Sequence, residues 1–165
     1  MPLSDIEIID FPGFPTAVVR FADHPMDQMH VAMDSAFGAL MQAIGSGEVQ
    51  PSGPAFSRYE SAPGATATFE TGFPLDAPLA EPVRIGEVEI VPSELPATRL
   101  AIAKHRGSYD GLGQSWEQFL LAVREQGLTP GYPFWEAYDT QPTPEMDPAD
   151  LVTGLAVPVS GHDEY

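Results

Sequence analysis

A carboxylate and a phenol lie two residues apart in the aromatic segment GYPFWEAYD, residues 131–139. Side chains alternate along a strand, so Phe134, Glu136 and Tyr138 would share one face, and Trp135 would lie on the other. Burying a carboxylate among aromatic rings is costly unless it gains a partner. The pattern leaves two interpretations: Glu136 faces water, or it meets a cation or a group that needs a proton.

A carboxyl group lodged among aromatics should have a raised pKa, which suits general acid chemistry as well as pairing with a cation. If the helices cover the Trp135 face, Glu136 points to the open face of the sheet and its partner is a ligand. Tyr138 could hydrogen-bond that ligand or relay a proton. From the spacing alone, an exposed strand face is an equal alternative for Glu136. For Glu70, a second acid in a strand-like segment, we expect a solvated position.

The elements that must position these residues occur twice in the same order. Strand-like and helix-like periodicities give a strand, a helix and two strands in each half of the chain. The first half is predicted to contain a strand at 16–21, a helix within 24–47, and strands at 53–61 and 66–75. The second is predicted to contain a strand at 98–105, a helix at 112–127, and strands at 131–139 and 150–159. We therefore predict an α+β fold, with both helices packed on one face of an antiparallel sheet.

The domain organisation that follows is a single domain over residues 1–165. Its first βαββ half spans about 14–76, a Pro- and Glu-rich connection with one short strand spans about 77–95, and the second half spans about 96–160. A length of 165 residues and a hydrophobic content of 43% suffice for one domain with a proper core.

The net charge of the chain limits the kinds of partner that it is expected to bind. Seven Lys and Arg against twenty-four Asp and Glu give a formal net charge of −17, which argues against nucleic acid and against an anionic membrane surface. The chain has no cysteine, and its four histidines have no ligand spacing, so we expect no metal and no cofactor. The acidic N-terminus lacks a signal-peptide pattern, and a cytoplasmic protein is expected.

Two segments together resemble a known family. They are His-x-Gly-x-Tyr, at His105, Gly107 and Tyr109, and Pro-Phe-Trp-Glu-x-Tyr at 133–138, followed by a strand that ends in Val-Pro-Val. The chain resembles the GyrI-like small-molecule-binding domain, which is also the effector-binding domain of AraC- and MerR-type bacterial transcription regulators. The resemblance covers essentially the whole chain, which looks like a stand-alone member because no DNA-binding segment precedes the domain.

The resemblance implies a duplicated βαββ fold with a ligand groove at a pseudo-two-fold axis. Family members bind lipophilic, often cationic compounds there, with an acidic residue at the centre, and this is the place expected for Glu136. The residues expected to line the pocket with it are Tyr138, Phe134, Tyr59, Phe56, Trp135, Tyr109 and Phe73. Alternation favours the core for Trp135, Phe73 is core or pocket wall, and His105 is expected to be a strand-end histidine with satisfied hydrogen bonds.

Three functions follow from these features. The first is binding or sequestration of lipophilic, cationic, aromatic compounds, as in multidrug or effector binding, through Glu136. The second is a hydrolase of strained or toxic small molecules, in which Glu136 and Tyr138 are the catalytic pair. The third is an acidic inhibitor that binds a basic protein partner. The sequence leaves the question of an enzymatic activity open and favours the binding module.

Overall fold

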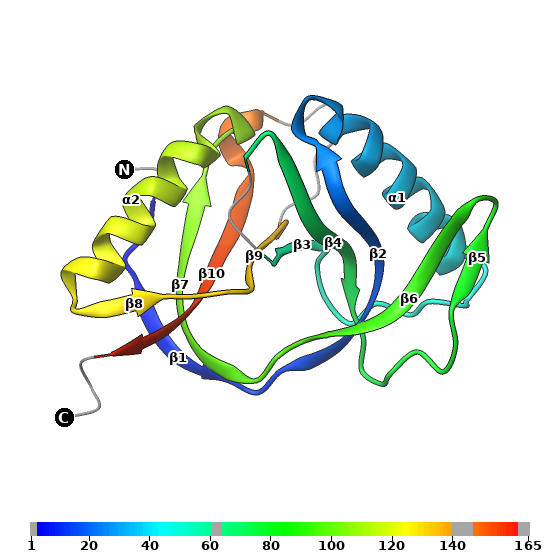
Figure 1. The fold of residues 1–165 in the computed structure, drawn as a ribbon, viewed down its shortest axis with the longest axis horizontal. Helices are drawn as coiled ribbons and strands as arrows, with labels where there is room; N and C mark the ends of the chain where they lie inside the picture. Colours follow the sequence, from blue (N-terminus) through cyan, green and yellow to red (C-terminus); the bar gives the residue numbers. More distant parts are fainter. Residues whose placement is uncertain (1–2, 61–63, 140–146, 162–165) are drawn as a thin grey trace. The chain divides into compact units, whose positions relative to one another are not determined.

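The computed structural model describes residues 3–60, 64–139 and 147–161, and the chain divides into two compact units. The central unit is Pro12–Ala97. The terminal unit combines Met1–Phe11 with Thr98–Tyr165. Each unit contains one α-helix and a set of antiparallel strands, so the fold is α+β as predicted (Figure 1).

The central unit is built on a long, bent strand. Its strands are β2 (Phe14–Pro25), β3 (Phe56–Tyr59), β4 (Thr66–Pro74), β5 (Val83–Ile85) and β6 (Val88–Leu95). They pair in the order β3-β4-β2-β6-β5, and every pairing is antiparallel. A short 3-10 turn, η1 (Met26–Gln28), leads from β2 into the helix α1 (Met29–Gly45).

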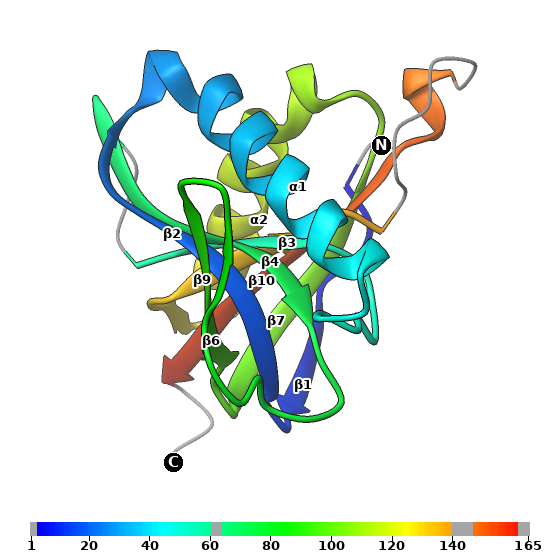
Figure 2. The ribbon, with the colours of Figure 1, turned by 90° about the vertical axis from the view of Figure 1, so that its right-hand side faces the viewer.

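The core of the central unit forms between α1 and one face of its strands. Ala17 and Val19 of β2 lie in one cluster with Ala36 and Leu40 of α1. Figure 2 shows α1 lying over the strands of the central unit, and its side chains share one cluster with residues of β2, β4, β5 and β6. Because side chains alternate along β2, Arg20 points to the opposite face. That face, away from α1, carries the groove described below.

The terminal unit takes its strands from both ends of the chain. They are β1 (Glu7–Phe11), β7 (Thr98–Arg106), β8 (Leu128–Pro130), β9 (Phe134–Ala137) and β10 (Val152–Gly161). The order is β1-β7-β10-β9, and β8 pairs with the far end of β10. The helix α2 (Leu112–Glu125) follows the turn η2 (Tyr109–Gly111), and η3 (Pro148–Asp150) precedes β10.

The core of the terminal unit lies between α2 and β7 with β10. Phe119 and Val123 of α2 pack in one cluster with Ala101 of β7 and Leu155 of β10. The turn between β7 and α2 depends on Gly107, whose φ of 131° is a conformation that glycine adopts readily. This turn brings the start of α2 back over the strands, which positions the site described next.

The central unit contains the order strand, helix, strand, strand as β2-α1-β3-β4, and the terminal unit contains β7-α2-β9-β10 with the additional strand β8 between α2 and β9. Three features were not predicted: β1, β8 and the pairing of two strands, β5 with β6, where the connection was expected to hold one. The pseudo-two-fold relation and the half boundaries remain predictions. Across residues 3–60, 64–139 and 147–161, no helix is long and apolar enough to cross a membrane.

Candidate functional site

Glu136 is buried and hydrogen-bonded on both carboxylate oxygens. It lies in the middle of β9 with 8% of its surface exposed. The indole Nε1–H of Trp116 donates to Oε1 over 2.9 Å, and the hydroxyl of Tyr138 donates to Oε2 over 3.0 Å. The alternative of an exposed acid is therefore wrong, and the carboxylate already has partners within the protein.

The face of β9 that carries Glu136 is the face that α2 covers. The ring of Phe134 lies 4.9 Å, centroid to centroid, from the ring of Trp116, and Phe134 packs against the core of the terminal unit. Trp135 points the other way, and its ring lies 5.4 Å, centroid to centroid, from the ring of Phe11 of β1, tilted by 51°. Glu136 and Trp135 lie on opposite faces of β9, as expected from alternation. The helix, however, covers the face of Glu136 and not that of Trp135, so Glu136 does not point to the open face.

The environment of Glu136 favours the protonated carboxyl group. Burial raises its pKa above the ordinary value, because desolvation disfavours the charged form. The hydrogen bonds from Trp116 and Tyr138, and a positive charge on His105, act in the opposite direction without cancelling the effect of burial. A carboxyl group with a raised pKa suits general acid chemistry, and an approaching cation would favour its ionised form.

His105 anchors the turn beside this site. Its Nδ1 lies 2.6 Å from the hydroxyl of Ser115, and its Nε2 lies 2.9 Å from the carbonyl oxygen of Ser108. The ring is buried, and both nitrogens have partners. This confirms the expectation of a strand-end histidine with satisfied hydrogen bonds. The side chain of Tyr109, which was expected at the pocket rim, lies outside the described part of the chain.

Three further residues predicted for the pocket belong to the central unit. Phe56 and Tyr59 are on opposite faces of β3, since Phe56 lies opposite Gly72 and Tyr59 lies opposite Phe69 in the register of β3 and β4. The prediction that both line one surface is therefore wrong. Tyr59 stacks on Phe69 at 5.7 Å between ring centroids, and Phe73 packs into the core of the unit.

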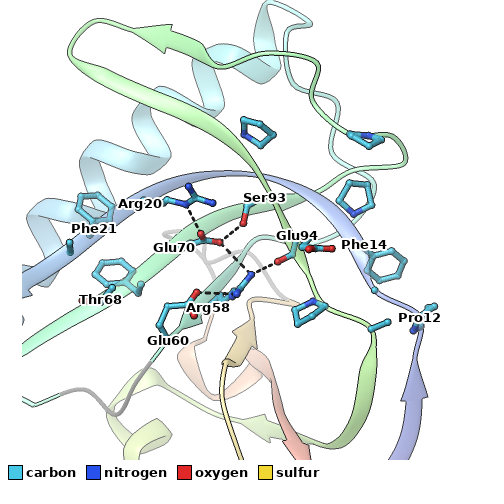
Figure 3. A pocket seen from close by; sticks show the side chains of 18 of the residues that line it. Pro12, Phe14, Arg20, Phe21, Arg58, Glu60, Thr68, Glu70, Ser93 and Glu94 are labelled. Carbon is cyan, nitrogen blue, oxygen red and sulfur yellow. Dashed lines mark hydrogen bonds and ion pairs between the residues drawn. The ribbon is translucent and has the colours of Figure 1, made fainter.

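Glu70 is a second buried acid, and its predicted solvated position is wrong. Its Oε2 accepts a 2.6 Å hydrogen bond from Nε of Arg20, and its Oε1 accepts one of 2.8 Å from the hydroxyl of Ser93. Nη1 of Arg58 lies 3.9 Å from Oε1. Figure 3 shows the two arginines approaching Glu70 from different sides. The three residues line a groove of about 1130 Å³.

Sequence reasoning missed Trp116, Arg20 and Arg58 as site residues. Trp116 lies on the apolar stripe of its helix, so its indole N–H was not considered as a donor. The available signal for Arg58 was a cation on a strand otherwise rich in apolar and hydroxyl residues, because a largely buried cation needs a carboxylate partner. Arg20 is 57% exposed, so it gave no such signal.

The fold and the site define a class: an α+β protein in which a strand carboxylate is buried under a helix and held by aromatic donors. Residues 4–160 match the family model described as "GyrI-like small molecule binding domain". The chain belongs to this GyrI-like family of small-molecule-binding domains.

Solved structures with this fold include a protein in complex with DNA, a protein bound to a small molecule and a hydrolase. The crystal structure of the EcmrR C-terminal domain has a TM-score of 0.71 and 16% identity, over 96% of this chain and 98% of that chain. In the EcmrR–DNA complex the TM-score is 0.75 with 16% identity, over 98% of this chain, which spans only 59% of that chain.

SAV2435, solved bound to tetraphenylphosphonium, has a TM-score of 0.66 and 10% identity, over 98% of both chains. A hydrolase from Listeria innocua has a TM-score of 0.60 and 13% identity, over 97% of this chain and 94% of that chain. At sequence identities of 10–16%, these comparisons show that the proteins share a fold and nothing further.

Proposed function

We propose that the protein binds lipophilic aromatic cations, with Glu136 as the charge that selects them. The observation that carries the proposal is a buried carboxylate whose two partners, Trp116 and Tyr138, are both neutral. No cation is paired with Glu136 within the described residues. A ligand cation would therefore supply the charge that burial makes costly to leave unpaired.

The hydrogen bonds of Glu136 favour one kind of cation. Each of its oxygens already accepts a donor from the protein, so a ligand can pair with the charge without offering N–H groups. An ammonium ion would lose its water hydrogen bonds on entering such a site, whereas a quaternary ammonium or phosphonium ion makes none in water. We expect the second type to bind more tightly. This accords with the tetraphenylphosphonium bound to the structural neighbour SAV2435.

Aromatic rings lead from the surface to the carboxylate. Tyr132 is 55% exposed, and its ring lies 5.7 Å from that of Phe134, which in turn contacts Trp116 beside Glu136. Rings of this kind attract a desolvated cation by about 0.5–2 kcal/mol each. In this proposal Tyr138 and Phe134 are ligand contacts.

The test is a titration monitored by tryptophan fluorescence. The panel is tetraphenylphosphonium, benzyltrimethylammonium, benzylamine and the neutral triphenylphosphine oxide. Tetraphenylphosphonium should quench saturably, and Glu136→Gln should weaken its binding by about tenfold or more, because the Coulomb attraction between the carboxylate and the cation is lost. Glu117→Gln is the matched control, because Glu117 is an exposed acid on α2 in the same unit. An equal loss for the neutral phosphine oxide would overturn the charge-selection proposal.

A hydrolytic activity is a second proposal, favoured by the 3.0 Å contact between the Tyr138 hydroxyl and Glu136. A carboxyl group with a raised pKa beside a phenol can hold and transfer a proton to a strained leaving group. In this case Tyr138→Phe should reduce turnover of such a substrate much more than it weakens its binding. Turnover unchanged in Tyr138→Phe would remove this residue from the mechanism.

The charge of −17 supports a third proposal, a basic protein partner. Such a complex should dissociate as salt is added, because surface charges are screened. The absence of a nucleic-acid partner and a cytoplasmic location remain predictions.

A further inference from the structure

The groove of the central unit has the dimensions and the walls of a ligand site. Its volume is about 1130 Å³, slightly above the roughly 300–1,000 Å³ of typical small-molecule pockets. Every residue that lines it belongs to the central unit, and Glu70 lies at its floor with 6% of its surface exposed. The Glu136 site, by contrast, is built from Trp116, Glu136 and Tyr138, which belong to the terminal unit.

One arginine in this groove is held in place and still has donors to offer. Nε of Arg20 donates a 2.6 Å hydrogen bond to Oε2 of Glu70, and Glu70 is the only partner of this arginine among the residues that the structure describes. The side chain of Arg20 is nevertheless 57% exposed. Because a guanidinium is planar, fixing Nε also fixes the direction of the two Nη groups beyond it.

The second arginine of the groove is already in use. Nη2 of Arg58 lies 3.0 Å from Oε1 of Glu60, and Nη1 donates to the backbone carbonyl of Glu94. Its side chain is only 15% exposed. Arg58 therefore helps to hold Glu70, and Arg20 is the cation that the groove offers to a ligand.

We propose that this groove is a second binding site, which takes a small monocarboxylate with an apolar body through the Nη groups of Arg20. The two terminal nitrogens of a guanidinium match the two oxygens of a carboxylate and form parallel hydrogen bonds. Glu70, with the hydroxyl of Ser93 on its other oxygen, is the positioning residue that presents Arg20.

The other charges of the groove limit the ligand to a single negative charge. Two arginines line it with four carboxylates, those of Glu60, Glu70, Asp76 and Glu94. The sum is negative and opposes any anion, a polyanion such as a phosphate more strongly than a monocarboxylate, so the attraction for the ligand must come from direct contact with the Nη groups of Arg20. The walls away from Arg20 are formed by apolar side chains that contain rings: Phe14, which is 44% exposed, and several prolines. An aromatic or cyclic acid is thus the class that fits.

The experiment measures by calorimetry how tightly the full chain binds 1-naphthoate and its neutral isostere 1-naphthamide. The carboxylate should bind saturably, and the amide should bind roughly tenfold more weakly or worse, as expected when charged hydrogen bonds are lost. Arg20→Gln should cause a similar loss for 1-naphthoate. Arg20→Lys, which keeps the charge without the planar fork, should lie between the two. Arg84→Gln is the matched control, because Arg84 is exposed on β5 of the same unit and does not line the groove.

Removing Arg20 leaves Glu70 buried without its closest cation, so folding is checked by circular dichroism. The double variant Arg20→Gln with Glu70→Gln removes both charges and should fold while failing to bind 1-naphthoate. Equal binding of acid and amide, no binding of either, or equal affinity in Arg20→Gln and Arg84→Gln would each overturn the proposal. Glu136→Gln should leave 1-naphthoate binding intact, so this result is independent of the cation site. If Glu136→Gln were the only variant to lose 1-naphthoate binding, the ligand would bind outside the groove, which would also overturn the proposal.

Discussion

The indole nitrogen of Trp116 lies 2.9 Å from Oε1 of Glu136 and donates a hydrogen bond to it. One residue of α2 thus has two roles: its ring packs on Phe134 in the core of the terminal unit, and its N–H stabilises the ionised carboxylate. The helix thereby controls how readily the strand acid can lose its proton. Each residue involved can be varied separately.

Trp116→Phe should raise the pKa of Glu136 further. Phenylalanine keeps an aromatic ring in the core but removes the donor that favours the ionised form. The pKa can be followed by NMR from the side-chain carboxyl carbon, with Glu136→Gln to identify the signal. Trp135→Phe is the control, since Trp135 packs on Phe11 on the other face of β9. A titration unchanged by Trp116→Phe would contradict this role of the indole.

The pH dependence of stability should reveal the cost of ionising Glu136. Its pKa is raised in the folded state above the ordinary value of 4.5, so the folded state holds the proton over a range in which the unfolded state has lost it. The free energy of unfolding therefore falls as pH rises from about 4.5 to the raised pKa and levels off above it, by about 1.4 kcal/mol per pKa unit.

Glu136→Gln cannot ionise, so the variant should gain stability relative to the native protein as pH rises through this window. Urea denaturation of both proteins at a series of pH values measures the difference. Glu117→Gln should show no such trend. A difference that stays constant with pH would mean that Glu136 is not held in its protonated form by burial.

Glu70→Gln should destabilise the central unit by about 1–3 kcal/mol. Breaking a buried ion pair costs more than this, but Arg20 is largely exposed and part of its charge is screened by solvent. Glu87→Gln, at an exposed turn position, serves as the control in the same denaturation experiment. Equal stability of the two variants would show that the contacts of Glu70 with Arg20 and Ser93 contribute nothing to folding.

Gly72 should tolerate no side chain. A Cβ at this position would lie 2.0 Å from the carbonyl oxygen of Ala17 and 2.8 Å from Cα of Val18, both part of the backbone of β2. Gly72→Ala should therefore cost about 3 kcal/mol or more, at the upper end for overpacking. Gly38→Ala provides the contrast, because Gly38 is an exposed helix position with nothing within 4 Å of a new Cβ. It should raise the free energy of unfolding by about 1 kcal/mol.

The helices and the longer strands could be predicted because their signals are local. The three- and four-residue spacing of apolar residues, including Leu40 in α1 and Phe119 in α2, marks the faces that pack in the two cores. Alternation likewise placed Glu136 and Trp135 on opposite faces of β9. Which face meets α2 depends on how the helix returns over the sheet, and no local pattern encodes that.

The groove of the central unit could not be predicted for the same reason. Arg20 is 50 residues from Glu70 in the sequence, and Ser93 is 23 residues away. Each of these residues alone looks like an ordinary polar position on a strand. Only the antiparallel register, which sets Arg20 opposite Glu70 and Glu70 opposite Arg58, reveals that the three charges converge.

The pairing of β1 with β7 has a consequence for synthesis of the chain. Phe11 lies opposite Thr98, so the first strand finds its hydrogen-bonding neighbour only after the whole of Pro12–Ala97 has been made. Domains generally fold as units while they leave the ribosome. The central unit, an uninterrupted stretch, is therefore complete before β7, the pairing partner of β1, has been made. A fragment covering Pro12–Ala97 can therefore be expressed as one piece, whereas the terminal unit requires both ends of the polypeptide.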